Sequence, residues 1–375
     1  MNTGKYIGSI REQLERHNVY ESRLKRNAAR PLPQRQRKSV GGALAAMSQH
    51  KSLPKRSAPR PLPRLLLVLG FLLTATPAMA ATVTSCDRQL TIEQPPQRAV
   101  SQDINLTGML LALGLKSRMV GYSGISAWKT PNPELMAQLA DLPELAARHP
   151  SLENLLNAEA DFFFAGWNYG MRVGGEVTPA SLARFGIPVY ELSESCAHVM
   201  PRRVASLEDV YNDLHNLGRI FAVQPRAEAL VQGMQQRVAA VRARLADSGP
   251  APRVFLYDSG EESPFTAGRL AMPQALIEAA GGRNVMDELA ASWVRVGWEA
   301  VISSDPEVIL IVDYGERSAA QKRDFLLQHP ALQGLTAIRE QRFVVLPYLA
   351  VTPSLENAAA IETLAAALHP QAFAR

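Results

Sequence analysis

A segment of 12 residues occurs twice in this chain, at 153–164 and at 299–310, and the two copies align without a gap. Each copy opens on a glutamate, Glu153 or Glu299, passes through an acidic turn and ends in consecutive apolar residues. This pattern predicts a short helix, a tight turn and a buried strand of a parallel sheet. Two copies of one unit predict two lobes of common design.

Strand and helix patterns alternate around the first copy. We expect, in order, a strand over 99–101, a helix over 103–113, a strand over 119–122, a helix over 178–185 and a strand over 187–191. Asp103 is a typical N-cap, and Gly114 and Gly186 can adopt the left-handed conformation that ends a helix.

The second lobe repeats this alternation. We expect a strand over 254–257, a helix over 273–280 ended by two glycines, the second repeat copy, a strand over 343–346 and a final helix. Such βαβ alternation predicts parallel sheets.

A long helix is expected between the lobes, over 225–245. Pro225 can start it, and its apolar residues recur every three or four positions: Leu230, Met234, Val238, Val241 and Leu245. At 1.5 Å per residue it would be about 30 Å long and brace one lobe against the other. The predicted fold is therefore α/β, with two Rossmann-like, parallel-rich lobes at 81–205 and 251–375 joined by a helical segment at 206–250.

Residues 1–80 are interpreted as an N-terminal extension followed by an export signal. Arg64 precedes an apolar run over 65–73, and the small residues Ala78 and Ala80 follow it. This run is too short to cross a hydrocarbon layer, which takes about 20 residues. We expect cleavage after Ala80 and a mature protein in the periplasm.

The leader carries the basic charge of the chain. Residues 1–80 hold 15 of the 40 Lys and Arg but 3 of the 35 Asp and Glu, which leaves 25 against 32 and a mature net charge near −7. An acidic mature domain argues against a nucleic-acid partner. The leader begins either at Met1 or, as we favour, at Met47.

The two cysteines, Cys86 and Cys196, both fall in the expected first lobe. An oxidising compartment permits them to pair, and we expect a disulfide. The alternative is a lipoprotein, because small residues precede Cys86. A lipidated cysteine should follow the apolar run closely, however, whereas Ala80 offers an earlier cleavage site.

Sequence motifs of common enzyme classes are missing. The chain has no GxSxG, Walker A, GxGxxG, HExxH or CxxC pattern, and its histidines are scattered without metal-ligand spacing. We therefore expect neither an enzyme nor a metal-ion site. A distant alternative is an exported hydrolase that uses Asp258 with Glu261 and Glu262, and His198 is a conceivable haem ligand.

Several segments resemble a known family over about residues 86–370. The most specific are Pro264–Gly268 and Ala279–Val285, with Leu113–Gly114 and Arg118–Gly121 as further family-like elements. They are similar to the class III periplasmic binding proteins of ABC importers for iron siderophores, haem and vitamin B12. The resemblance implies a monomeric solute-binding protein that meets the membrane only through a permease dimer and its ATPase subunits.

In that family one surface glutamate per lobe docks onto arginines of the permease. The matching positions here are Glu153 and Glu299, which lead the two repeat copies. The alternative is that both are helix-start acids favoured by the helix dipole.

The resemblance also places a ligand between the lobes, where strand-end loops are rich in aromatic residues. The expected ligand contacts are Tyr122, Trp128, Trp167, Tyr169, Phe265, Trp293 and Tyr348, together with Arg172 and Arg295. Large aromatics suit a broad ligand with an apolar periphery, and arginines suit carboxylates or an anionic chelate. The alternative for each aromatic residue is that it packs in the core of its lobe, and the alternative for the arginines is that they are solvated by water. We expect an iron siderophore first, a corrinoid second and haem third, so iron or cobalt would belong to the ligand and not to a cofactor.

Overall fold

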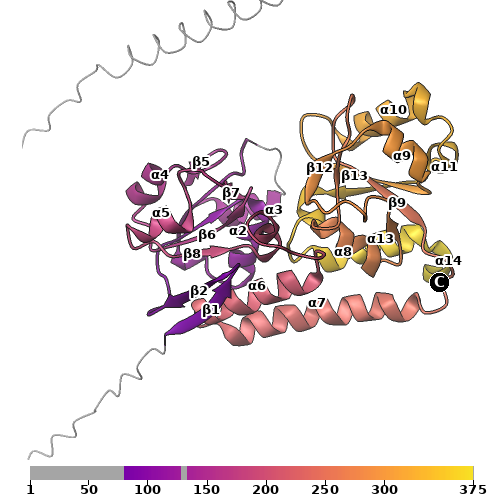
Figure 1. The fold of residues 1–375 in the computed structure, drawn as a ribbon. Coiled ribbons are helices and arrows are strands. Elements are labelled where there is room, and N and C mark those ends of the chain that lie inside the picture. Colours follow the sequence, from indigo (N-terminus) through magenta and orange to yellow (C-terminus); the bar gives the residue numbers. More distant parts are fainter. Residues whose placement is uncertain (1–79, 128–132, 375) are drawn as a thin grey trace, which may run out of the picture. The chain divides into compact units, whose positions relative to one another are not determined.

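The computed structural model describes residues 80–127 and 133–374, which form two α/β lobes and connecting helices (Figure 1). The predicted apolar run at 65–73 and the predicted ligand contact Trp128 lie outside the described residues. Cleavage after Ala80 stays a prediction. No helix of the described residues is long and apolar enough to cross a membrane.

The first lobe is built on a parallel sheet in the order β5-β4-β3-β6, and both β7 and β8 pair with β6. Its strands are β3 (Ala99–Gln102), β4 (Met119–Ser123), β5 (Glu144–Ala146), β6 (Phe162–Trp167), β7 (Gly170–Met171) and β8 (Val189–Glu191). Its helices are α2 (Ile104–Ala112), η1 (Lys116–Arg118), α3 (Pro133–Leu139), α4 (Leu152–Asn157), α5 (Pro179–Ala183) and η2 (Ser193–His198). The predicted strand-helix alternation is confirmed, and Gly114 and Gly186 have φ values of 78° and 70° at the ends of their helices.

The second lobe has a parallel sheet in the order β11-β9-β13-β14 and a separate antiparallel pair, β10-β12. Its strands are β9 (Arg253–Tyr257), β10 (Phe265–Ala267), β11 (Arg283–Asn284), β12 (Trp293–Arg295), β13 (Val308–Asp313) and β14 (Phe343–Pro347). Its helices are α8 (Met272–Ala279), α9 (Trp298–Ser304), α10 (Ala319–Gln328), η3 (Pro330–Leu332), α11 (Thr336–Arg339), α12 (Tyr348–Val351), α13 (Asn357–Leu368) and α14 (Pro370–Phe373).

The repeated segment occupies the same place in both lobes. The first copy forms α4 and β6, and β6 pairs in parallel with β3, the first strand of its sheet. The second copy forms α9 and β13, and β13 pairs in parallel with β9, the first strand of the second lobe. The predicted helix, turn and buried strand are therefore confirmed twice.

Two helices connect the lobes, α6 (Leu207–Ile220) and α7 (Gln224–Arg244). The long helix α7 packs on α6 and on α13 of the second lobe (Figure 1). Met234, Val238 and Val241 of the predicted stripe are buried, but Val231 takes the buried place expected for Leu230. One cluster of buried apolar residues continues from the first lobe through α7 into the second, so the helix braces the two lobes.

A disulfide fixes a hairpin to the first lobe. Cys86 lies in the turn between β1 (Ala81–Ser85) and β2 (Arg88–Ile92), and its sulfur is bonded to Cys196 in η2. The predicted pairing is thus present, and a cysteine in a disulfide has no thiol to accept a lipid. Arg88 and Ser85 of the hairpin both donate hydrogen bonds to the buried carboxylate of Glu191.

Candidate functional site

The residues that follow the strands of the two sheets meet between the lobes. Tyr348 comes directly after β14, and its hydroxyl donates a hydrogen bond to Oδ2 of Asp103, which comes directly after β3, over 3.0 Å. Tyr314 follows β13 and stacks on Tyr348 with ring centroids 4.5 Å apart. The carboxyl ends of strands are where open α/β sheets bind their ligands.

Asp103 caps helix α2 of the first lobe and also contacts Tyr348 of the second lobe. As the N-cap of α2 it accepts a hydrogen bond from the backbone N–H of Ile104, as the sequence predicts. Burial raises the pKa of Asp103 from 3.8 to about 6, although its hydrogen bonds from Ile104 and Tyr348 act in the opposite direction. Asp103 therefore places a buried carboxyl group at the contact between the lobes.

An aromatic wall, which we define as Tyr169, Phe265 and Trp293, stands beside this contact. Phe265 and Trp293 lie on the paired strands β10 and β12, and their rings stack with centroids 5.9 Å apart. The guanidinium of Arg295 lies over the Phe265 ring, 5.5 Å from its centroid. The side chain of Trp293 lies close enough to the hydroxyl of Tyr169 in the first lobe to act on the pKa of that hydroxyl. The wall therefore spans both lobes.

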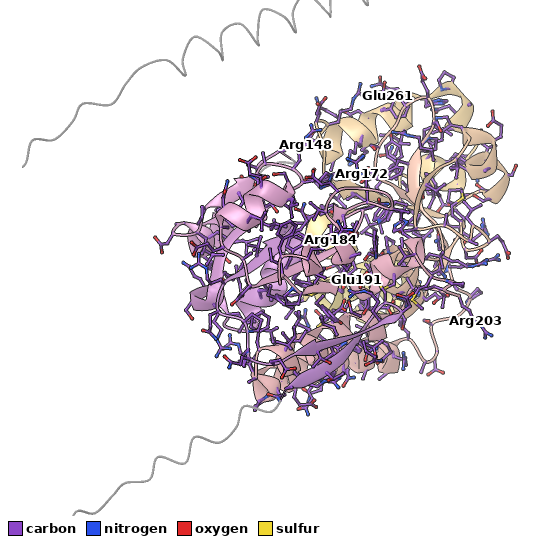
Figure 2. The ribbon with its side chains drawn as sticks, turned by 60° about the vertical axis from the view of Figure 1, so that its left-hand side comes forward. Arg148, Arg172, Arg184, Glu191, Arg203 and Glu261 are labelled. Atoms are coloured by element: carbon purple, nitrogen blue, oxygen red, sulfur yellow. A yellow bond between two sulfur atoms is a disulfide. The ribbon has the colours of Figure 1, made fainter. Side chains whose placement is uncertain are left out.

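A basic cluster, Arg148, His149 and Arg172, lies at the same end of the first lobe. A cavity of about 240 Å³ is lined by His149 and Arg172, among others. Partial desolvation lowers the pKa of His149, and the charges of Arg172 and Arg148 lower it further. Figure 2 labels both arginines in the same part of the molecule. Arg148 is also close enough to Tyr314 of the second lobe to act on its pKa. The cluster thus borders the interlobe site.

The second lobe contributes a larger cavity of about 710 Å³ at the ends of its strands. Arg295 and Tyr314 line it, so it adjoins the aromatic wall and the stacked tyrosines. Glu261 lines it as well and forms an ion pair with Arg317. Cationic and aromatic groups therefore border the site on both sides.

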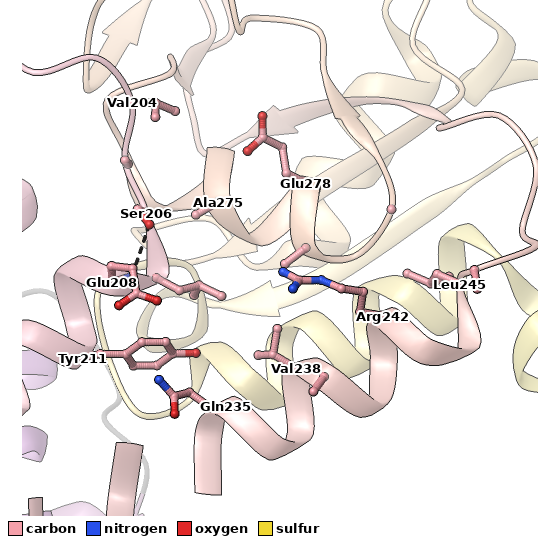
Figure 3. A pocket seen from close by; sticks show the side chains of 16 residues that line it. Val204, Ser206, Glu208, Tyr211, Gln235, Val238, Arg242, Leu245, Ala275 and Glu278 are labelled. Carbon is pink, nitrogen blue, oxygen red and sulfur yellow. Dashed lines mark hydrogen bonds between the residues drawn. The ribbon is translucent and has the colours of Figure 1, made fainter. Parts of the chain in front are cut away.

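Another cavity, of about 630 Å³, lies elsewhere. It is formed by α7, α8 and the segment that leads into α6, and Figure 3 shows Arg242 reaching into it from α7. Tyr211, Gln235 and Glu278 also line it. Since none of the predicted ligand contacts lines this cavity, we do not assign the ligand to it.

Some predicted ligand contacts lie apart from the wall. Tyr122 is 5% exposed in a small core with Ile125 and Leu139, which leaves it little surface for a ligand. Trp167 ends β6, and its indole N–H donates a hydrogen bond to the buried Glu191 over 2.8 Å. The structure brings Tyr169, Phe265, Trp293, Arg295 and Tyr348 together, and places Arg172 in the neighbouring basic cluster.

Sequence reasoning missed Arg148, His149 and Tyr314 and treated Asp103 only as a helix cap. Tyr314 had a usable signal, because it follows the strand of the second repeat copy and strand ends carry ligand contacts. Arg148 and His149 follow β5, which has three residues and is too short to recognise from its pattern.

The two predicted docking glutamates are exposed. Glu153 lies in the first turn of α4 and Glu299 in the first turn of α9. The helix-dipole explanation and a docking role both fit this position.

A metal ion has no obvious place in the part of the chain that the structure describes, where no three His, Cys, Asp or Glu side chains are grouped to hold one. His198 contacts Asn168, with 3.2 Å between its Nε2 and the amide nitrogen, and its neighbour Cys196 is engaged in the disulfide.

Comparison with known proteins places the chain in a family. A family model described as "Periplasmic binding protein" matches residues 100–349. The vitamin B12-binding protein of Yersinia pseudotuberculosis is 25% identical over 252 residues, which cover 67% of this chain and 76% of that protein.

Two solved structures share the fold. A periplasmic binding protein from Veillonella parvula has a TM-score of 0.68 at 27% identity, covering 78% of this chain and 98% of its own. A periplasmic heme binding protein from Pseudomonas aeruginosa has a TM-score of 0.59 at 25% identity, and the match covers 74% of this chain and 94% of that protein. With two α/β lobes and a bracing helix, the chain belongs to the class III periplasmic binding proteins, the non-enzymatic solute-binding components of ABC importers.

Proposed function

We propose that this protein captures a metal chelate, an iron siderophore first of all, between its lobes in the periplasm and delivers it to the permease. The observation that carries this proposal is the juxtaposition of the aromatic wall with cationic groups from both lobes. The wall consists of Tyr169, Phe265 and Trp293. It is flanked by Arg295 from the second lobe and by Arg148 and Arg172 from the first.

The aromatic wall and the arginines around it together suit a broad, anionic ligand. Phe and Trp each bury about 150 to 250 Å² of surface and lose little conformational entropy. Arginine pairs well with carboxylates and other planar anions. Together these groups fit a ferric chelate with a hydrophobic periphery and net negative charge. The metal would enter as part of the ligand, bound by the chelator and not by protein side chains.

Two other ligands are supported by specific observations. A corrinoid is the second candidate because Phe265 and Trp293 belong to the region that resembles vitamin B12-binding proteins, and a relative with that name matches this chain. Haem is the third candidate, since a heme-binding protein shares the fold at 25% identity. All three would use the same wall.

Delivery would use one glutamate per lobe, Glu153 and Glu299, against basic groups of the permease. An exposed ion pair contributes roughly 0 to 1 kcal/mol to the binding free energy. The two pairs would therefore orient the encounter with the permease and raise the association rate more than the affinity. Weak docking suits a protein that loads and unloads as a monomer.

A tryptophan fluorescence titration tests the ligand class. The mature protein is titrated with ferric siderophores of different charge, cobalamin, cobinamide and haem. Saturable quenching by one of them is expected, and Trp293→Ala should weaken that ligand about tenfold, while Phe185→Ala should not. Phe185 is a suitable control because it is 50% exposed near the end of α5. If none of these chelates changes the fluorescence or binds in a parallel calorimetric titration, the proposal is wrong.

A further inference from the structure

Two exposed aliphatic side chains occupy equivalent positions in the two lobes. Only a few large apolar residues among those described are exposed, and Leu156 on α4 and Ile302 on α9 are two of them, at 37% and 38%. Each lies three residues after the exposed glutamate of its helix, Glu153 or Glu299. Residues three apart share one face of a helix. Each lobe therefore presents a carboxylate and an aliphatic side chain together.

The match extends to the residues beneath. Leu155 and Val301, the positions just before the exposed aliphatic residues, are both fully buried and anchor their helices in the core. Of the residues in the two aligned copies only the leading glutamate is identical, yet a large aliphatic side chain stands at the same exposed place in both. Single exposed aliphatic residues are ordinary on protein surfaces, so it is this duplication beside a carboxylate that needs an explanation.

Both helices are also held in the same way. Arg98 Nε donates to the carbonyl oxygen of Glu159 over 2.8 Å at the end of the first copy's helix. Arg253 Nε donates to the carbonyl oxygen of Asp305, the aligned residue of the second copy, over 2.9 Å. Glu159 and Asp305 both have positive φ, 48° and 37°. The turns that follow the two helices are therefore tied alike to the start of the first strand of their sheets, because Arg98 directly precedes β3 and Arg253 is the first residue of β9.

We propose that Glu153 with Leu156, and Glu299 with Ile302, form two equivalent docking patches, and that the transmembrane permease covers both. Two copies of one surface motif fit a partner that offers two copies of one receptor surface, as a two-fold symmetric permease does. Each receptor surface would pair a basic group with a small apolar socket. This inference rests on the proposed function and adds the two aliphatic residues to it.

The two aliphatic residues would slow dissociation from the permease, which the exposed glutamates do little to achieve. A solvent-exposed ion pair contributes mainly to orientation and on-rate, whereas burial of apolar surface slows dissociation without dependence on salt. On each lobe the glutamate would thus orient the encounter with the permease, and the aliphatic side chain would slow dissociation.

Photo-crosslinking in cells identifies the partner. A benzophenone amino acid is placed at Leu156, at Ile302 or, as control, at Val345, which is 46% exposed on β14. Both patch positions should cross-link to the same transmembrane subunit of an ABC importer, and Val345 should not. A cross-link from neither position, or to different proteins, overturns the proposal.

Affinity for that importer in nanodiscs, measured by interferometry, then separates the two contributions. Leu156→Ala with Ile302→Ala should weaken binding at least about tenfold, and Val345→Ala should have no such effect. If the aliphatic variant binds like wild type while Glu153→Arg with Glu299→Arg does not, this inference fails and glutamate docking stands. If both variants bind like wild type, the proposed docking fails as well.

Discussion

The backbone N–H of Met272 in the second lobe donates a hydrogen bond to Oε1 of Glu194 in the first, over 2.7 Å. The hydroxyl of Tyr169 contacts the other carboxyl oxygen at 3.4 Å. Burial raises the pKa of Glu194 from 4.5 to about 7, and Asp209 raises it further, while the hydrogen bond from Met272 and the charge of Arg202 act to lower it. An acid with a displaced pKa therefore joins the lobes beside the aromatic wall.

This displaced pKa predicts how stability depends on pH. The folded state binds the Glu194 proton more tightly than the unfolded state does. The stabilisation that this proton contributes to the folded state is therefore complete below pH 4.5 and is lost as the pH rises towards 7. Glu194→Gln can still accept from Met272 and does not titrate. At pH 8 it should be more stable than wild type by on the order of 3 kcal/mol, and at pH 4 the difference should vanish.

Urea unfolding at several pH values measures this difference. Glu153→Gln is the matched control, because it makes the same change at an exposed position. Parallel stability curves for wild type and Glu194→Gln between pH 4 and 8 would contradict the assignment.

The disulfide should stabilise the fold substantially. Cys86 and Cys196 are 110 residues apart in sequence, and closing a loop of that size restricts the unfolded chain. Cys86→Ser with Cys196→Ser should cost about 2 to 5 kcal/mol. Thermal unfolding with and without a reductant checks it: reductant should lower the Tm of wild type to that of the double variant. A Tm insensitive to reductant and substitution would show that the bond contributes nothing.

The basic cluster should select for ligand charge. Arg148→Ala and Arg172→Ala should each weaken a negatively charged chelate about tenfold and a neutral one much less, because an ion pair at a partly desolvated site is lost. The loss should shrink as salt is raised, since salt screens partly exposed charges. Arg184→Ala is the control, an exposed arginine at the end of α5 (Figure 2). Equal losses for charged and neutral chelates would contradict this selectivity.

Most of the fold was predictable because it rests on local patterns. The repeat copies, the strand-helix alternation and the helix over 225–245 all follow from apolar periodicity with Gly, Pro and Asp at the ends. The shift of the buried stripe from Leu230 to Val231 was not predictable, because it depends on how α7 packs on α6 and α13.

The site was predictable only in part, for a physical reason. Strand-end position indicated Tyr169, Trp293 and Tyr348, but it carries no information about which way a side chain points. Tyr122 ends up in a core for that reason. Contacts such as Asp103 to Tyr348 join residues 245 apart and depend on how the lobes pack, which no local pattern encodes.

Uptake of the chelate that the titration selects tests delivery through Glu153 and Glu299 most directly. Cells producing Glu153→Arg with Glu299→Arg are compared with wild type and with Glu93→Arg and Glu288→Arg, a charge-matched control on exposed residues outside α4 and α9. Uptake should be lost in the first variant and kept in the control, while the purified first variant binds the chelate with unchanged affinity. Normal uptake by the first variant would contradict delivery through these two glutamates.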